Sequence, residues 1–333
     1  LRSRYFDEHK LSGMGNRTVP ASTANLFRIM KEYYPTASKV INYIQELEDD
    51  AKFISKLNDP LKLPRTVDDG IKDDLLAIKI LGGPTAHARI SIITAYRRWR
   101  YNNEFKEFVS FLVKFHFRNR TIGREAPGTM DGLMLSVAKM ISDDTKSLDD
   151  VKNYLREKDI DDETFSFLFE RYQIKDSSFG RYMLLEIEEK LNKGRQSDMR
   201  PLDKLTLEHI LPQNSGEWDF DDFFDDWSSE SKQKKFESLT YEIGNMALLT
   251  PSHNSEATNH PFPQKIIDVY ASESLKLNVI KKTVLNISEI VDNDDLQDLP
   301  ELANDLTRWT ANIIEKRTQK FAAMALEIWD LNE

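Results

Sequence analysis

The stretch of sequence that decides the fold is Leu205-Thr206-Leu207-Glu208-His209-Ile210-Leu211-Pro212-Gln213. Apolar and polar residues alternate along its first half, which predicts a β-strand, and Pro212 ends the strand because it has no amide hydrogen to give to a sheet. Elsewhere the apolar residues recur at helical spacing, and only 12 glycines and 12 prolines interrupt the 333 residues. The sequence therefore predicts a mainly α-helical protein whose helical domains enclose one small core that contains β-structure.

The helical segments carry apolar stripes that we expect to be buried. Pro35-Thr36 opens one helix, whose stripe consists of Val40, Ile44, Leu47, Ala51 and Ile54. Comparable stripes lie in 84–117, in 133–141, in 184–191 and in a final helix from Leu302 to Ile328. Stripes of this kind are typical of a packed helical core.

A break in the helical pattern at Lys193-Gly194-Arg195 predicts a domain boundary near residue 197. The expected parts are a helical domain at 1–196, a core at 197–275 and C-terminal helices at 276–333. Within the core, the acidic stretch from Asp219 to Trp227 lacks a calcium-loop pattern and predicts an exposed amphipathic helix.

Composition excludes several classes of protein. No apolar run reaches the roughly 18 residues that a membrane span needs. The chain has no cysteine, which excludes disulfides, thiolate nucleophiles, iron–sulfur clusters and cysteine-based zinc modules. Any metal would be held by His, Asn or carboxylate groups, and oxygen-rich sites favour Mg²⁺ or Mn²⁺. We expect a cytoplasmic protein and, because the chain begins at Leu1 without a methionine, a piece of a longer one.

Charge is segregated along the chain. The net charge of −10 argues against general nucleic-acid binding, yet the segment 89–124 holds nine basic residues against two glutamates, with aromatic residues interleaved. One interpretation is a pair of helices with an aromatic core and a solvated basic face. The other is a surface that tracks phosphates, with Trp99 buried behind it. In that case the residues lining the DNA path are Arg97, Arg98, Arg100, Arg118, Arg120 and Arg124.

Three short strings in the core region carry groups suited to cutting a phosphodiester bond. They are Glu208-His209-Ile210-Leu211-Pro212-Gln213, then Ile243-Gly244-Asn245-Met246-Ala247-Leu248-Leu249, then Asn254-Ser255-Glu256-Ala257-Thr258-Asn259 with Phe262 and Lys265 downstream. Taken singly, each has a structural explanation: a core histidine, a turn and a helix cap. Their order along the chain favours a joint function.

An imidazole such as that of His209 titrates near neutrality and suits a general base. Glu208 and Asn254 offer the oxygen ligands that Mg²⁺ prefers. Asn245 can bond backbone groups and hold the loop that positions the histidine, and Gly244 permits a close backbone approach. Because neighbours on a strand face opposite sides, Glu208 and His209 reach one site only where the strand twists or ends.

Together the three strings resemble the HNH endonuclease domain of GmrSD-type restriction enzymes, and SspE-type phage-defence nucleases carry a similar domain. The first string is also similar to the HNH domain of CRISPR effector nucleases. In ordinary HNH proteins a histidine lies nine residues after the asparagine of Gly-Asn; here that position is Asn254, as in the asparagine variant of the motif. The resemblance covers about 197–275.

This resemblance implies a ββα-metal fold for the core and the activity of a Mg²⁺- or Mn²⁺-dependent DNA endonuclease that nicks or cleaves. It makes Glu208 and Asn254 the metal ligands, His209 the general base and Asn245 the structural middle residue. Asn259 and Lys265 would support the helix and a phosphate. His253 competes with Asn254 as a ligand, and His260 is interpreted as structural.

The resemblance further implies a role in restriction–modification or antiviral defence, with phage or modified DNA as the substrate. The family's nucleotide-dependent N-terminal sensor has a Gly-Gln-Gln-Arg-type string, which this sequence lacks, so we expect the sensor on another part of the protein. Double-strand cleavage would need a second copy or a second event, so a homo-oligomer is one expectation. The alternatives are a non-catalytic helical module that binds DNA or protein, and a metallohydrolase of another substrate, which the absence of His-Glu-x-x-His weakens.

Overall fold

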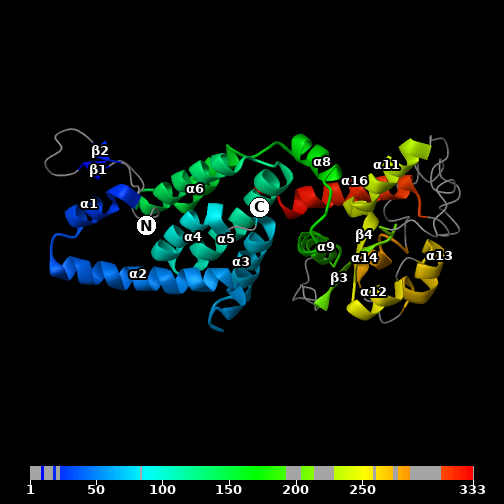
Figure 1. Cartoon of the computed structure of the whole chain (residues 1–333), viewed down its shortest axis with the longest axis horizontal. Coiled ribbons are helices and arrows are strands. Elements are labelled where there is room, and N and C mark those ends of the chain that lie inside the picture. Colours follow the sequence, from blue (N-terminus) through cyan, green and yellow to red (C-terminus); the bar gives the residue numbers. More distant parts are fainter. Residues whose placement is uncertain are drawn as a thin grey trace. The chain divides into compact units, whose positions relative to one another are not determined.

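The computed structural model describes residues 9–10, 18–19, 23–82, 85–192, 204–213, 229–257, 260–272, 277–285 and 309–332. The chain forms two compact units, Leu1–Ile160 and Asp161–Glu333. Helices dominate both units (Figure 1), so the expected mainly α-helical class is confirmed. Among the described residues, no helix combines the length and the apolar character that crossing a membrane requires.

The first unit contains a short hairpin and a set of helices. The hairpin pairs β1 (His9–Lys10) with β2 (Thr18–Val19). The helical elements are α1 (Thr23–Tyr33), α2 (Ala37–Asn58), η1 (Pro60–Lys62), α3 (Asp69–Gly82), α4 (Thr85–Trp99), α5 (Asn103–Phe115), η2 (His116–Ile122), α6 (Pro127–Ser142) and α7 (Leu148–Arg156). The helix predicted after Pro35-Thr36 is α2, and the Thr36 hydroxyl accepts a hydrogen bond from the Lys39 amide as its N-cap.

The aromatic residues of segment 89–124 form the core of the first unit. α4 packs against α6, α5 and α3. Trp99 is only 8% exposed, and the rings of Phe53 and Tyr96 stack with their centroids 3.8 Å apart. The other aromatic side chains of this segment that are fully or almost fully buried are Phe105, Phe108, Phe111, Phe115 and Phe117. The aromatic core that the sequence predicted for this segment is therefore confirmed.

The apolar stripe expected on α2 is wrong along its whole length: Ala51 is exposed, Leu47 and Ile54 are only partly buried, and the other two members are exposed as well. Val40 is 40% and Ile44 57% exposed, and the buried positions of the helix are Tyr43, Asp50, Phe53 and Leu57. Tyr43 stacks on Tyr34 with a centroid distance of 4.3 Å, and the carboxylate of Asp50 accepts a hydrogen bond from Arg97. The buried face is thus selected by an aromatic stack and an ion pair, neither of which follows from apolar spacing.

The second unit surrounds a two-stranded antiparallel sheet of β3 (Thr206–His209) and β4 (Met246–Leu249), with Thr206 opposite Leu249 and His209 opposite Met246. β3 is the strand predicted around Glu208. The helical elements of this unit are α8 (Asp162–Glu170), α9 (Ser177–Leu191), α11 (Ser229–Thr240), η4 (Ile243–Asn245), α12 (Pro251–Ala257), α13 (Phe262–Lys265), η5 (Ile266–Tyr270), α14 (Asn278–Lys281) and α16 (Ala311–Ile328). α12 follows β4 directly and packs against both strands.

The boundary between the two units lies at residues 160 and 161, whereas the sequence predicted one near residue 197. α9, expected in the N-terminal domain, packs on the sheet instead. Arg181 donates to the Leu205 carbonyl over 3.0 Å, and the Glu188 carboxylate accepts from the Asn278 amide over 2.9 Å. Such long-range contacts leave no mark in the local pattern. Residues 193–203 and the acidic stretch 219–226 lie outside the described residues.

Candidate active site

Glu208 lies in a buried cluster behind β3. Its side chain is 5% exposed, and its Oε1 accepts hydrogen bonds from Lys265 Nζ at 2.7 Å and from the Tyr270 hydroxyl at 2.9 Å. Burial raises the pKa of Glu208 and lowers that of Lys265, and the ion pair between them opposes both shifts. Both bonds go to the same carboxylate oxygen.

Lys265 is fully buried, and its ammonium group donates three hydrogen bonds. Besides Glu208, it donates to the carbonyls of His209 at 3.0 Å and Ile210 at 3.1 Å. An ammonium group has three hydrogens, so these bonds satisfy it. The residue predicted to support a helix and a phosphate therefore ties Glu208 to the end of β3, away from the surface.

Asn245 holds the chain immediately after His209. Its side-chain amide is fully buried and bonds both backbone groups of Leu211, accepting from the amide at 2.7 Å and donating to the carbonyl at 2.9 Å. It also donates to the Thr240 carbonyl and accepts from Trp309 Nε1 at 3.0 Å. This is the loop-holding contact expected of Asn245 from the sequence; its part in catalysis stays a prediction.

Gly244 brings this loop against α16. A Cβ atom at this position would lie 2.1 Å from the Ile314 carbonyl oxygen and 2.3 Å from Thr318 Oγ1. The Gly244 amide donates to that same hydroxyl over 3.1 Å. The close backbone approach predicted from Gly-Asn therefore exists, and its partner is the C-terminal helix.

His209 and Asn254 each contain a buried polar atom whose hydrogen-bonding capacity is not used. Within the described part of the chain, His209 Nε2 and Asn254 Oδ1 are buried without a hydrogen-bond partner. His209 is the last residue of β3, and Asn254 lies on α12, which packs against that strand. Burial, reinforced by the charge of Lys265, lowers the pKa of His209 to about 4, so its imidazole is neutral at pH 7. Buried polar atoms without partners are rare, and each calls for an explanation such as strain, a bound water or ion, or a catalytic role.

The other histidines and amides of the region are arranged differently. His253 Nδ1 lies 2.8 Å from the Thr250 hydroxyl, whereas His260 Nδ1 is a third buried atom without a partner. Asn259 falls outside the described residues. Across the ranges that the structure describes, no three His, Asp or Glu side chains gather as a metal-binding group. An ion here would need amide, phosphate or water oxygens as further ligands.

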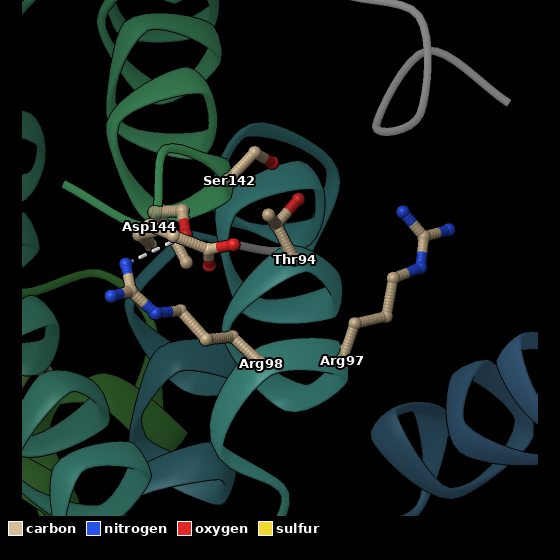
Figure 2. A pocket seen from close by; sticks show the side chains of 6 residues that line it. Thr94, Arg97, Arg98, Ser142 and Asp144 are labelled. Atoms are coloured by element: carbon tan, nitrogen blue, oxygen red, sulfur yellow. Dashed lines mark hydrogen bonds between the residues drawn. The ribbon is translucent and has the colours of Figure 1, made fainter. Parts of the chain in front are cut away.

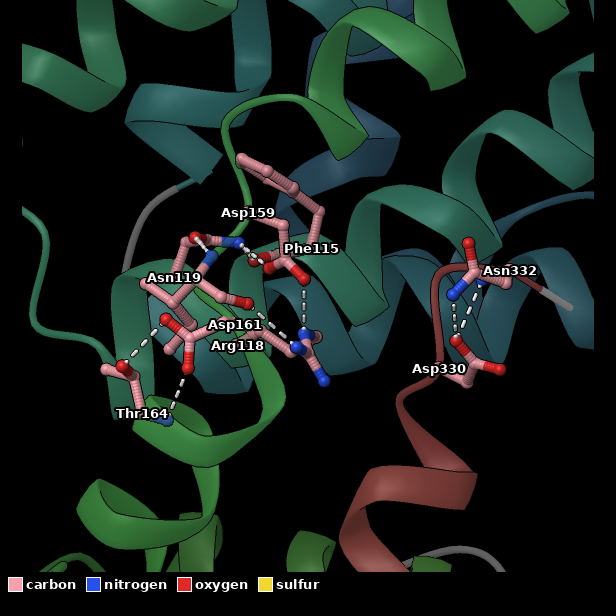
Figure 3. A network of polar contacts seen from close by, with 9 residues as sticks. Phe115, Arg118, Asn119, Asp159, Asp161, Thr164, Asp330 and Asn332 are labelled. Atoms are coloured by element: carbon pink, nitrogen blue, oxygen red, sulfur yellow. Dashed lines mark hydrogen bonds and ion pairs between the residues drawn. The ribbon is translucent and has the colours of Figure 1, made fainter.

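The arginines predicted to line a DNA path lie in the first unit and have unequal environments. Arg118 is 3% exposed; it donates to Asp159 Oδ2 at 2.8 Å and to the Ile160 carbonyl at 2.9 Å, and Asn119 shares the same carboxylate (Figure 3). Its guanidinium therefore lies below the surface, where it cannot meet a phosphate. Arg97 Nε donates to Asp50 over 2.9 Å.

Five members of the set keep part of their side chain at the surface, including the ion-paired Arg97, which is 21% exposed. Arg98 and Arg97 leave α4 in different directions beside an open cavity of about 350 Å³ (Figure 2), and Arg98 Nη1 donates to the Ile141 carbonyl at 2.9 Å. Arg100 and Arg124 are exposed and adopt φ values of 54° and 55°. Arg120 is partly exposed. Fewer of the six arginines are therefore placed to contact a phosphate than the sequence predicted.

Two residues of the site were missed by the sequence analysis. Trp309 is 2% exposed and reaches Asn245, and Arg317 is fully buried and donates to the carbonyls of Gly244 and Met246 at 2.6 and 2.7 Å. A signal was present in the sequence: Arg317 shares one helical stripe with Ile313 and Phe321. A charged residue on an apolar stripe requires buried acceptors.

The comparisons with known proteins concern this second unit. Residues 159–324 match the model of the C-terminal domain of GmrSD restriction endonucleases. The match begins two residues before the second unit and includes every site residue from Glu208 to Arg317. No curated protein matches the chain. Through residues 159–324, the chain therefore belongs to the family of GmrSD restriction endonuclease C-terminal domains.

Proposed function

We propose that this chain is a metal-dependent DNA endonuclease in which His209 activates water for hydrolysis of a phosphodiester bond. The observation that carries the proposal is the buried, unpartnered Nε2 of a neutral His209. A neutral imidazole with an unbonded ring nitrogen can take a proton from water. Membership in a restriction endonuclease family supports DNA as the substrate.

The surrounding contacts suit a general base that must be held still. Lys265 binds the His209 carbonyl, and Asn245 binds both backbone groups of Leu211, two residues further on. The backbone from His209 to Leu211 is thereby fixed before substrate arrives. Such preorganisation matters because a displacement of about 1 Å can cost on the order of 10² in rate.

Glu208 and Asn254 would hold a Mg²⁺ or Mn²⁺ ion. Asn254 fits this role because its Oδ1 is a buried oxygen without a partner among the described residues. Glu208 fits through the carboxylate oxygen that does not bond Lys265 and Tyr270. When bound, the ion would neutralise charge on the phosphate and on the departing oxygen.

The first unit would supply phosphate contacts through four partly or fully exposed members of the predicted set, Arg98, Arg100, Arg120 and Arg124. Arg97 and Arg118 are excluded from the proposal because Asp50 and Asp159 hold them. Recognition of phage or modified DNA, an N-terminal sensor outside this chain and assembly into a homo-oligomer accompany the proposal as expectations for the whole protein.

Nicking of supercoiled plasmid with Mg²⁺, with and without chelator, tests the proposal. His209→Ala should lower the rate by about 10² to 10⁴, the usual effect of losing a general base. His253→Ala is the matched control because its imidazole already bonds Thr250, and it should nick normally. Circular dichroism and DNA binding should remain near wild type in both variants.

Near wild-type nicking by His209→Ala would remove this residue from the mechanism. A wild-type chain that binds DNA but cuts it with neither Mg²⁺ nor Mn²⁺ would favour the alternative of a non-catalytic DNA-binding module.

A further inference from the structure

Two residues of the C-terminal segment, one just before α16 and one within it, bond to the loop that contains Asn245. Trp309, just before α16, donates its indole hydrogen to Asn245 Oδ1 at 3.0 Å. Arg317, two turns into the helix, donates to the carbonyls of Gly244 and Met246, the residues on either side of Asn245. The loop is therefore held through its side chain and through its backbone.

A short series of bonds joins Trp309 to the proposed general base. Asn245 Oδ1 accepts from Trp309 and from the Leu211 amide at 2.7 Å, while its Nδ2 donates to the Leu211 carbonyl at 2.9 Å. The indole thus fixes the rotation of the same amide group that clamps the chain two residues after His209. Without the indole hydrogen, the Asn245 side chain loses one of its four bonds and gains freedom to rotate.

Arg317 holds the backbone of this loop at the expense of burying a charge. Its guanidinium is fully buried, and its remaining bonds go to the Thr283 hydroxyl at 2.9 Å and the Val279 carbonyl at 3.3 Å. The rings of Phe321 and Trp309 lie 4.6 and 5.8 Å from it. Because burying a cation among neutral oxygens is costly, a residue that needed only to fill space here would be apolar.

We propose that Trp309 and Arg317 are positioning residues for the His209 site, acting through Asn245 on the backbone that bears the imidazole. This inference rests on the proposed nuclease function. It adds that the C-terminal segment positions the site and does not merely flank it.

The principal test is Trp309→Phe in the full chain, which removes the indole hydrogen and keeps an aromatic ring against Phe262, whose centroid lies 5.0 Å away. Trp329→Phe is the matched control: this tryptophan is 1% exposed, ends the same helix and bonds the Tyr182 hydroxyl over 3.5 Å. Measured where both variants are fully folded, kcat should fall about 10- to 100-fold for Trp309→Phe, with KM for plasmid unchanged. Trp329→Phe should keep the wild-type kcat.

Two further readouts separate positioning from general stability. In an Asn245→Ala background, Trp309→Phe should have little additional effect on kcat, because the two residues act in one pathway. Hydrogen exchange at the Leu211 amide should become faster in Trp309→Phe and not in Trp329→Phe. Arg317→Lys keeps the charge but cannot span two carbonyls, and where it folds it should lower kcat in the same way.

The exchange measurement also separates the two proposals. If the wild-type chain does not nick DNA, the proposed function fails, and faster Leu211 exchange in Trp309→Phe still supports the positioning of the strand end. If the wild type nicks, and Trp309→Phe keeps kcat within twofold with unchanged Leu211 exchange, the positioning role is overturned while the nuclease function stands.

Discussion

Replacing Gly244 with alanine should strongly destabilise the second unit. The added Cβ would lie 2.1 Å from the Ile314 carbonyl oxygen and 2.9 Å from the Thr318 backbone nitrogen, both of them backbone atoms of α16. Backbone atoms inside a helix cannot swing aside as the end of a side chain can. The loop and the helix would have to separate by about 1 Å to restore an ordinary contact.

The energetic cost follows from the hydrogen bonds that this separation would disrupt. The bond from the Gly244 amide to Thr318 Oγ1 and the bond from Arg317 to the Gly244 carbonyl would both stretch or break. A buried polar group left without its partner costs about 1–3 kcal/mol, and overpacking costs about 1–3 kcal/mol more. We expect the free energy of unfolding to fall by about 2–6 kcal/mol, a large share of the roughly 5–15 kcal/mol of a typical domain.

Urea-dependent hydrogen exchange at the amides of β4 measures this free energy for the second unit alone. Gly180→Ala is the graded control, because its Cβ would meet only the Leu207 and Ile174 side chains, which can shift. Gly132→Ala, with open space around the new atom, lies in α6 of the first unit and should raise helix stability there by about 0.5–1 kcal/mol, measured by exchange at the amides of α6. A Gly244→Ala protein within about 1 kcal/mol of wild type would refute the reasoning.

Asn254→Ala should raise the Mg²⁺ concentration needed for half-maximal nicking; a tightly bound zinc ion that copurifies would contradict the ligand assignment. Arg118→Ala should lower the stability of the first unit by about 3–5 kcal/mol, because it leaves a carboxylate without its cation, and should not alter the salt dependence of DNA binding. Neutralising Arg100 and Arg124 together should instead reduce that salt slope by about 0.9 for each phosphate contact removed, and an unchanged slope would show that neither touches DNA. Acidification from pH 6.5 towards 4 should lower the free energy of unfolding of the wild type more than that of His209→Gln. The reason is that over this range the His209 imidazole binds a proton in the unfolded chain and stays neutral in the folded one. Equal acid sensitivity of the two proteins would contradict the lowered pKa of His209.

Several features could be predicted because they depend on local chemistry alone. Alternation up to Pro212 predicted β3, and Thr36 marked the start of α2 as its N-cap. Gly244 and Asn245 were expected to give a close backbone approach and a loop clamp, and both contacts exist. A strand's alternation, a cap and a glycine's freedom each follow from one or a few neighbouring residues.

Other features were decided by partners that are distant in the sequence. Val40 and Ile44 belong to a regular stripe yet face outward, since an aromatic stack and an ion pair turn another side of α2 inward. Arg118 resembles its basic neighbours in sequence but is buried on Asp159. Composition indicated that the segment is basic, but only packing determined which of its charges remain at the surface.

By itself, the sequence determined the helical class, the strand at Glu208 and His209, and the close approach and loop contact at Gly244 and Asn245. Only the tertiary structure decided that Lys265 forms a buried ion pair with Glu208 and that α9 packs on the sheet. It also decided that Trp309 and Arg317 hold the Asn245 loop. The physical reason is that periodicity reports local backbone geometry, whereas a buried charge is stable only where folding brings its partners together.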